Sequence, residues 1–430
     1  MLKQLKMIPA GYGVTWCSLD HLLTNFRLLI PVILFSVLLS NVGVAVAARV
    51  DITGSQTTPY ACDGGNECWL WSDASISVRL PAATTFAASG DQTKIISCGT
   101  IINEVLVAAG YSSAIGMAAI DGGYARNEAT GVVWLKGDDS SSGAVAYGMV
   151  AQGDSATVVN IGNITITSIN YAVGVALGGS RAWGDINGNI VITGGNHGYY
   201  ATGIETLPMG FHDNCATLRV KSATITLTLN PTGSLWEISK SVGILLENKI
   251  LGDISDSAIT VNTSRDSCGI HVGNSFVAVR NSTIVVTGAD GHKVYGLYSS
   301  GSGSFVTIYG GTTLRTAGID AHGIHVVNGG RVNLNATANS WVTIDSQSGK
   351  SIFVNGPGSE VNNYGNLLFN ASSSRADNRV SVSPVVTESE GIFNNYGKIA
   401  IHGYYSVGIT TFGSGVNSGT VSHYGDTLAD

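Results

Sequence analysis

Two histidines stand in matching sequence contexts, and their arrangement raises the first chemical question. Gly-Ile-His-Val occurs as CGIHV at 268–272 and as HGIHV at 322–326, so His271 and His325 hold the same place in two copies of one phrase. Histidine is a common ligand of zinc, so the pair has two interpretations: a shared metal site, or one position in a repeated structure. The choice depends on the elements that position the two side chains.

Other arrangements with catalytic potential are sparse in this sequence. It contains neither the H-E-x-x-H of zinc proteases nor the G-x-S-x-G of many hydrolases. Asp320 and His322 in GIDAHG come closest to a general acid–base pair, but we expect them at a corner between repeats. We therefore predict no catalytic residue, no metal site and no cofactor.

The composition favours many short strands over helices. The chain has 430 residues, of which 12% are charged and 56 are glycine. Average proteins contain roughly 25% charged residues and about 7% glycine. The formal net charge is −7 and no basic block is present, which argues against a nucleic-acid partner.

An apolar run near the start predicts export. Residues 28–39 read LLIPVILFSVLL, follow Arg27 and precede small residues in an Ala-x-Ala pattern. This is typical of a secretory signal, here residues 1–48 with an extended N-terminal region and cleavage after Ala47 or Ala48. A membrane anchor over 28–48 is the alternative.

Two cysteines at the ends of a short loop are candidates for a disulfide. In CDGGNEC, Cys62 and Cys68 flank a Gly-containing loop, and an oxidising compartment would favour their pairing. Zinc is the rival interpretation, but the spacing is unusual for zinc and no histidine is close in sequence. The pairing of Cys98, Cys215 and Cys268 is left open.

A glycine that precedes an apolar pair recurs along the chain and marks a repeat. Neighbouring markers in the middle of the chain follow one another at a nearly constant interval, as from Gly243 to Gly269 and from Gly269 to Gly296. The markers are Gly148, Gly174, Gly203, Gly243, Gly269, Gly296, Gly323, Gly349, Gly391 and Gly408.

Each repeat holds three short strands separated by polar turns. A unit of this size cannot bury its own apolar face, but a stack of such units can. We predict an all-β fold, a right-handed parallel β-helix with about 26–27 residues per coil over residues 141–430. Residues 49–140 match the repeat poorly and are expected to form an N-terminal cap or irregular first coils. An antiparallel sandwich and a propeller are the alternatives.

This architecture answers the question about the two histidines. Strand alternation places Ile270 and Val272 inside and His271 outside. Because successive coils are about 4.8 Å apart, two coils separate His271 from His325 by nearly 10 Å, too far for one metal to bind both. The predicted outer stripe over four coils, a possible contact surface, is Leu245, His271, Tyr298 and His325.

The Gly- and Asn-rich repeats, the predicted signal and the low charge together resemble the passenger region of adhesin-type bacterial autotransporters. VNNYGNLLFN at 361–370 and FNNYGKIAIHG at 393–403 carry the resemblance most clearly, and it covers residues 100–425. It implies export through the inner membrane, passage through the outer membrane and display at the cell surface. No segment of the size of the family's translocator barrel follows the repeats, so contact with the outer membrane would require a translocator missing from this sequence.

The leading hypothesis is a secreted or surface-displayed, non-enzymatic β-helix in adhesion or surface interaction. Its partners would be host or bacterial surface molecules or a polysaccharide. The alternatives are a β-helical polysaccharide lyase or hydrolase, and an inert stalk or truncated passenger fragment.

Overall fold

The computed structural model describes most of the chain from Ala48 onward. The predicted signal, residues 1–48, lies outside the described residues apart from Ala48. The described residues contain no helix, and hence none that is long and apolar enough to cross a membrane. The described ranges are 48–79, 84–104, 113–137, 145–167, 169–194, 200–206, 216–229, 240–289, 292–318, 320–347, 350–371, 384–403, 409–411 and 420–424.

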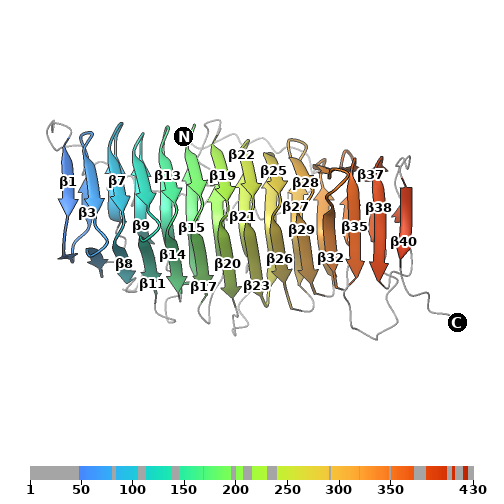
Figure 1. Ribbon diagram of the computed structural model, residues 1–430, viewed down its shortest axis with the longest axis horizontal. Coiled ribbons are helices and arrows are strands. Elements are labelled where there is room, and N and C mark those ends of the chain that lie inside the picture. Colours follow the sequence, from blue (N-terminus) through green and yellow to red (C-terminus); the bar gives the residue numbers. More distant parts are fainter. Residues whose placement is uncertain are drawn as a thin grey trace, which may run out of the picture. The chain divides into compact units, whose positions relative to one another are not determined.

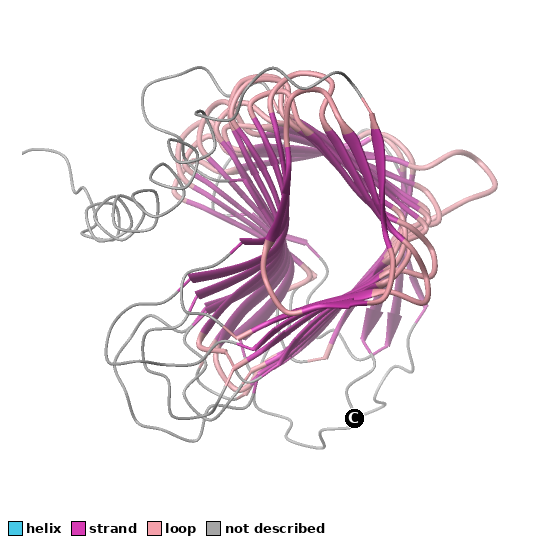
Figure 2. Ribbon diagram, turned by 90° about the vertical axis from the view of Figure 1, so that its left-hand side faces the viewer, coloured by secondary structure: helices cyan, strands magenta, loops and turns pink. Residues whose placement is uncertain are grey.

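The strands of the described part form three parallel sheets, here called A, B and C. Consecutive strands pass from sheet A to sheet B to sheet C and then return to sheet A, one coil further on. Figure 1 shows the coils side by side in sequence order, and Figure 2 shows the three sheets around one central axis. The predicted parallel β-helix is thus confirmed, and the parallel pairing excludes the antiparallel sandwich.

Sheets A, B and C contain strands of two to eight residues, and sheet C has the longest. Sheet A contains β1 (Arg49–Ile52), β4 (Glu67–Leu70), β7 (Lys94–Ser97), β10 (Tyr124–Asn127), β13 (Thr157–Asn160), β16 (Trp183–Ile186), β19 (Thr217–Lys221), β22 (Leu251–Ser255), β25 (Phe276–Arg280), β28 (Phe305–Tyr309), β31 (Arg331–Asn335), β34 (Glu360–Asn363) and β37 (Ile392–Asn395). Sheet B contains β2 (Ser55–Gln56), β5 (Ser75–Val78), β8 (Thr100–Glu104), β11 (Val132–Lys136), β14 (Asn163–Thr167), β17 (Asn189–Thr193), β20 (Thr224–Leu229), β23 (Ala258–Thr263), β26 (Thr283–Thr287), β29 (Thr313–Ala317), β32 (Val342–Ser346), β35 (Asn366–Ala371), β38 (Lys398–Gly403) and β40 (Thr420–Tyr424). Sheet C contains β3 (Tyr60–Cys62), β6 (Thr84–Ser89), β9 (Ser113–Ile120), β12 (Val145–Gln152), β15 (Tyr171–Gly178), β18 (Tyr200–Thr206), β21 (Lys240–Glu247), β24 (Asp266–Gly273), β27 (Lys293–Ser300), β30 (Asp320–Val327), β33 (Ile352–Asn355), β36 (Val385–Glu388) and β39 (Ile409–Thr411).

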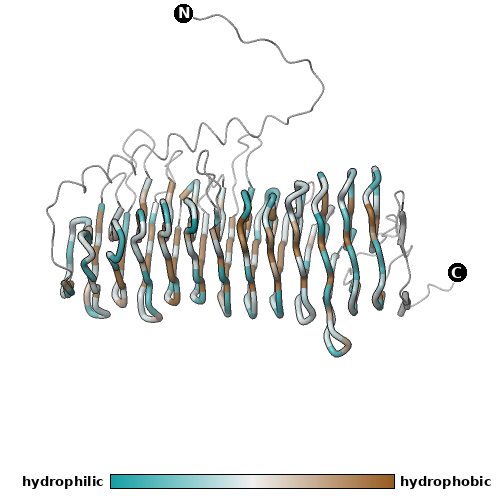
Figure 3. The backbone as a smooth tube through the Cα atoms, turned by 90° about the horizontal axis from the view of Figure 1, so that it is seen from above, coloured by the Kyte–Doolittle hydropathy of each residue, from teal (hydrophilic) through white to brown (hydrophobic). Residues whose placement is uncertain are grey.

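Alternation along each strand builds one continuous core inside the coils. In β26, Ile284 and Val286 are fully buried, whereas Thr283 and Thr287 are exposed. A single cluster of buried apolar side chains runs from Ile52 to Ile401. Figure 3 shows the corresponding alternation of apolar and polar residues along the tube. Each coil therefore buries its apolar side chains against the coils next to it.

The predicted coil length is observed in the middle of the chain, but at least one other coil is longer. His271 pairs with Tyr298, and Tyr298 pairs with His325, so two successive coils have the same length, which is the predicted one. Trp183 pairs with Thr217, and the coil between these two partners is longer. Insertions between strands therefore change the coil length without changing which strands pair.

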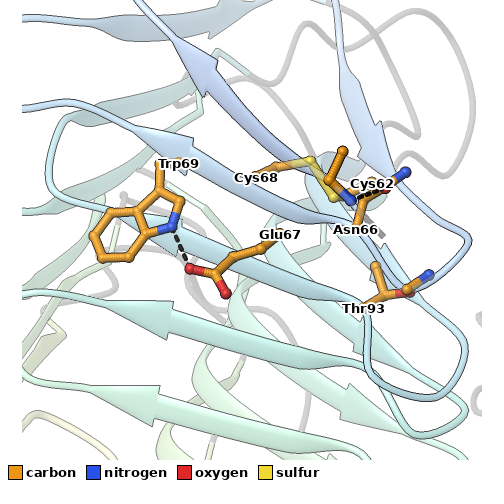
Figure 4. Close-up of a disulfide and its surroundings, with 8 residues drawn as sticks. Cys62, Asn66, Glu67, Cys68, Trp69 and Thr93 are labelled. Atoms are coloured by element: carbon orange, nitrogen blue, oxygen red, sulfur yellow. Dashed lines mark hydrogen bonds between the residues drawn. A yellow bond between two sulfur atoms is a disulfide. The ribbon is translucent and has the colours of Figure 1, made fainter. Parts of the chain in front are cut away.

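The first coils belong to the same sheets as the rest of the solenoid. Residues 49–140, for which the sequence suggested a cap or irregular first coils, carry β1 to β11, and these pair in parallel with the strands that follow. A disulfide joins Cys62, at the end of β3, to Cys68 in β4 (Figure 4). Because β3 lies in sheet C and β4 in sheet A, the bond closes the corner between two sheets.

Most of the marker glycines form one column in sheet C, where each strand bends. A methyl group added at any glycine of this column would lie 2.5–2.7 Å from the carbonyl oxygen at the same place in the next coil, which leaves no room for a side chain. Gly391 is not part of the column, because it precedes β37 of sheet A. In the coil after Gly323, the column position is occupied by Ser351. Gly349 and Gly408 lie outside the described residues. The column is Gly116, Gly148, Gly174, Gly203, Gly243, Gly269, Gly296 and Gly323.

Candidate binding site

The four residues of the predicted stripe stand in one register on sheet C. Leu245 pairs with His271, His271 with Tyr298, and Tyr298 with His325, across β21, β24, β27 and β30. The centroid of the Tyr298 ring lies 4.8 Å from that of His271 and 5.4 Å from that of His325. A tyrosine ring therefore separates the two histidines that opened the question.

Two of the four side chains in this stripe are buried, and the other two, Tyr298 and His325, are only partly exposed. Leu245 and His271 are each 8% exposed. Leu245 belongs to a second apolar cluster with Val242 and Cys268, outside the main core, and Tyr298 packs against that cluster. The bend at Gly269 turns both Cys268 and His271 to the outer face, although they are three positions apart in the strand. Strict inside–outside alternation of side chains does not predict this second outer row. Side chains of the two rows pack against each other and reduce each other's exposure.

The second outer row extends the stripe into a cluster of six rings. The ring of Tyr295 lies 4.6 Å from that of His325, and the Nδ1 atoms of His322 and His325 are 2.6 Å apart. His322 was expected at a coil corner together with Asp320, but both residues belong to β30. We call His271, Tyr295, Tyr298, His322, His325 and Phe353 the ring cluster.

Burial keeps the imidazoles of the ring cluster neutral near neutral pH. The pKa of His322 is lowered to about 3 by burial, by His325 and by Lys350. Burial, Lys350 and Lys293 lower the pKa of His325 to about 4. For His271, burial and the charge of Lys240 hold the pKa well below its usual range. These histidines are therefore poor proton carriers at neutral pH and contribute mainly through packing.

The free thiol next to the ring cluster is also unreactive. Cys268 is 1% exposed, and burial raises its pKa to about 12. A thiol of this kind is not a nucleophile at neutral pH, because the thiolate is the reactive form. Within the described ranges, no three His, Cys, Asp or Glu side chains are grouped so as to hold a metal ion.

A buried carboxyl group, missed by the sequence interpretation, lies in the same outer row as the stripe. Glu205 in β18 pairs with Leu245, yet it is only 3% exposed. Burial and the charge of Glu247 raise the pKa of Glu205 to about 8, although a hydrogen bond from Tyr200 opposes the shift. Glu205 is therefore mostly protonated near pH 7. Its sequence context, TGIE, contains no signal that would separate it from an exposed strand glutamate.

Sheet A carries three of the large apolar side chains that are exposed in the described solenoid. Leu251 is 54% exposed, Phe276 is 52% exposed and Trp183 is 39% exposed. Leu251 pairs with Phe276, and Phe276 pairs with Phe305, so these three side chains stand in adjacent coils. They line a shallow depression of about 380 Å³ in the outer face of sheet A. We call Trp183, Thr217, Leu251, Phe276 and Phe305 the sheet A row.

One sequence pattern predicts the sheet A row. Each member is the first residue of the second strand in its repeat, a position that alternation places outside. Following the same position through successive repeats identifies the row, in the way that the stripe was identified on sheet C.

Comparison with known proteins adds no identification. No family model, no curated protein and no solved structure matches this chain.

Proposed function

We propose that this chain is a secreted or surface-displayed, non-enzymatic β-helix, similar to autotransporter passengers, that acts in adhesion or surface interaction. The observation that carries the proposal is the sheet A row, with three large apolar side chains exposed in close succession. Contiguous exposed apolar surface costs free energy in water, and it commonly marks an interaction site. A stack of coils holds such side chains in fixed positions, because each strand between the ends of a sheet is paired on both sides.

The sheet A row makes a specific prediction for attachment. Native cells that produce the chain with Phe276→Ser should attach less to their target surface than cells with the unchanged chain. The matched control is Trp134→Ser, because Trp134 is 37% exposed but lies on sheet B. Equal attachment by both variants, at equal amounts of chain, would remove sheet A from the mechanism.

The cellular location is tested separately. An immunoblot against residues 240–340, with and without protease on intact cells, should show a protease-sensitive band if the chain is displayed. A band that protease leaves intact in whole cells and removes in lysed cells would contradict surface display.

The alternative, a β-helical polysaccharide lyase or hydrolase, is favoured by one observation. Glu205 is a carboxyl group whose pKa is raised to about 8, and the charge of Glu247 contributes to the shift. Glycoside hydrolysis uses a protonated carboxyl group beside a second carboxylate. The alternative ranks second because Glu205 is 3% exposed, and a substrate must reach the carboxyl group. Polysaccharides left intact by the purified chain would rule it out.

A further inference from the structure

The sheet A row crosses successive coils along the solenoid axis, with four apolar side chains and Thr217 among them. Trp183 pairs with Thr217, Thr217 with Leu251, and Leu251 with Phe276. Phe305 follows, with its ring centroid 6.3 Å from that of Phe276. Because neighbouring parallel strands are about 4.8 Å apart, the four steps from Trp183 to Phe305 cover about 19 Å. A ligand in contact with the whole row must be an extended chain.

A polar row runs beside the sheet A row, two positions further along each strand. Asp185 pairs with Arg219, and Arg219 pairs with Asp253, so charges alternate from coil to coil. Arg219 donates from Nε to Asp185 Oδ1 at 2.9 Å, and Arg280 forms an ion pair with Asp253. Two guanidinium groups therefore balance two carboxylates. The side chains of Arg219 and Asp253 remain 49% and 53% exposed, so both can form further hydrogen bonds.

Small residues open the depression between the two rows. Ala278 occupies the polar row, where the longer side chains of Asp185, Arg219 and Asp253 stand in the preceding coils. The volume of about 380 Å³ lies near the lower end of the range for small-molecule sites, roughly 300–1,000 Å³. Apolar lining with a few convergent polar groups is the usual composition of such sites.

We infer that the sheet A row is a binding site for a neutral oligosaccharide chain that lies along the solenoid axis. This inference rests on the proposed function and names its ligand class. A sugar ring presents an apolar C–H face, which packs against Phe276, Phe305 or Trp183, as aromatic rings favour such contacts. Its hydroxyl groups donate to Asp253 and accept from Arg219 while both ion pairs persist.

The charge balance separates this ligand from other classes. An acidic polymer or nucleic acid would need an excess of cations in the site, and the four charged residues here sum to zero. An anionic membrane surface would need Lys or Arg along the apolar row, whereas that row is flanked by Thr157 and by Arg331, which is paired with Glu360. A protein partner would need roughly 800 Å² of its own surface, far more than this small depression supplies.

Binding of defined sugars to the full-length chain tests the inference. The probes are neutral hexasaccharides of glucose, mannose and galactose with 1,3 and 1,4 linkages, and hexagalacturonate serves as the acidic comparison. Calorimetry should detect at least one neutral hexasaccharide, bound more tightly than hexagalacturonate. Phe276→Ala should raise its Kd about tenfold, which is the effect of losing one ring contact of about 1.4 kcal/mol. Trp134→Ala on sheet B should leave the Kd unchanged.

A second variant tests sugar binding without removing an apolar side chain from the sheet A row. Asp253→Asn preserves the shape of the side chain and removes a charged acceptor, so it should also weaken binding severalfold while circular dichroism stays unchanged. The inference is overturned if no neutral hexasaccharide binds at millimolar concentration, or if Phe276→Ala leaves the Kd unchanged. If Phe276→Ser still abolishes attachment in that case, the adhesion proposal stands and a protein partner replaces the glycan. If attachment is also unaffected, sheet A has no part in attachment, and the proposed function loses the observation that carries it.

Discussion

At the scale of single residues, surroundings decide what a side chain on the outer face can do. His271 and His325 occupy equivalent places two coils apart, yet His271 is 8% exposed and His325 is only partly buried. Both imidazoles are neutral at neutral pH, because burial and the nearby lysine charges both disfavour the charged form. The ring cluster is therefore best regarded as packing on the outside of sheet C.

Glu205 makes a prediction about pH at the same scale. Its folded pKa of about 8 lies above the ordinary value of 4.5, so the folded state retains a proton that the unfolded state releases. The resulting stabilisation is fully present below about pH 4.5 and is lost as pH rises through 8. The glutamine of Glu205→Gln cannot ionise. As the pH rises from 5 to 8, the stability of this variant should therefore increase relative to that of the unchanged chain.

Urea unfolding at pH 5 and pH 8 measures this difference. Linkage predicts about 1.4 kcal/mol for each pH unit by which the two pKa values differ, as an upper bound. Glu388→Gln is the control, since Glu388 is a carboxylate in an ion pair with Lys350 and its side chain is 43% exposed. A pH trend that is the same for Glu205→Gln and the unchanged chain would show that Glu205 is ionised in the folded protein.

At the scale of elements, the bend in each sheet C strand explains why a glycine recurs. A methyl group at Gly269 would collide with Ile284 Cγ2 and lie 2.6 Å from the carbonyl oxygen of Gly296. Gly269→Ala should therefore destabilise the chain by about 1–3 kcal/mol, the usual cost of overpacking a core. The lowered urea midpoint is the measurement.

Gly273→Ala is the matched control for the bend, because it lies in the same strand β24. A methyl group there would meet Glu247 Cγ at 3.3 Å, at the flexible end of a long side chain. It should change stability by far less than Gly269→Ala. Equal effects of the two substitutions would mean that the strand relaxes around the bend and that the column is not sterically required.

At the scale of the whole molecule, one core passes through all coils while each coil contacts only its neighbours. Ile284 is fully buried between Ile259 and Leu314 of the adjacent coils. Ile284→Ala should cost about 2–5 kcal/mol and should act locally, because solenoid stability is a sum of nearest-neighbour terms. Hydrogen exchange should speed up most in β23, β26 and β29 and least in β5 and β38.

Thr283→Ala is the control for this experiment, because Thr283 is the exposed neighbour of Ile284 in β26. It should leave the exchange pattern unchanged. A loss of protection spread evenly over all described strands in Ile284→Ala would show that the solenoid unfolds as one cooperative unit.

The features that repeat within the chain can be predicted from the sequence alone. Three strands per unit follow from alternation, and the register of Leu245, His271, Tyr298 and His325 follows from the period of the repeat. The period of the repeat also identifies the marker glycines of sheet C. Gly391 was wrongly included among them, because a glycine before an apolar pair also occurs at a turn that leads into sheet A. Periodicity predicts which residues share a row and which side of the sheet they face.

The accessibility of each outer position depends on tertiary packing and cannot be predicted from the repeat. Leu245, His271 and Glu205 face outward by alternation, yet each is at most 8% exposed. Leu251 and Phe276, in the equivalent situation on sheet A, are more than half exposed. Exposure depends on the packing of side chains from neighbouring coils and on strand bends such as that at Gly269. These contacts join residues far apart in sequence, so the pattern within one repeat does not contain them.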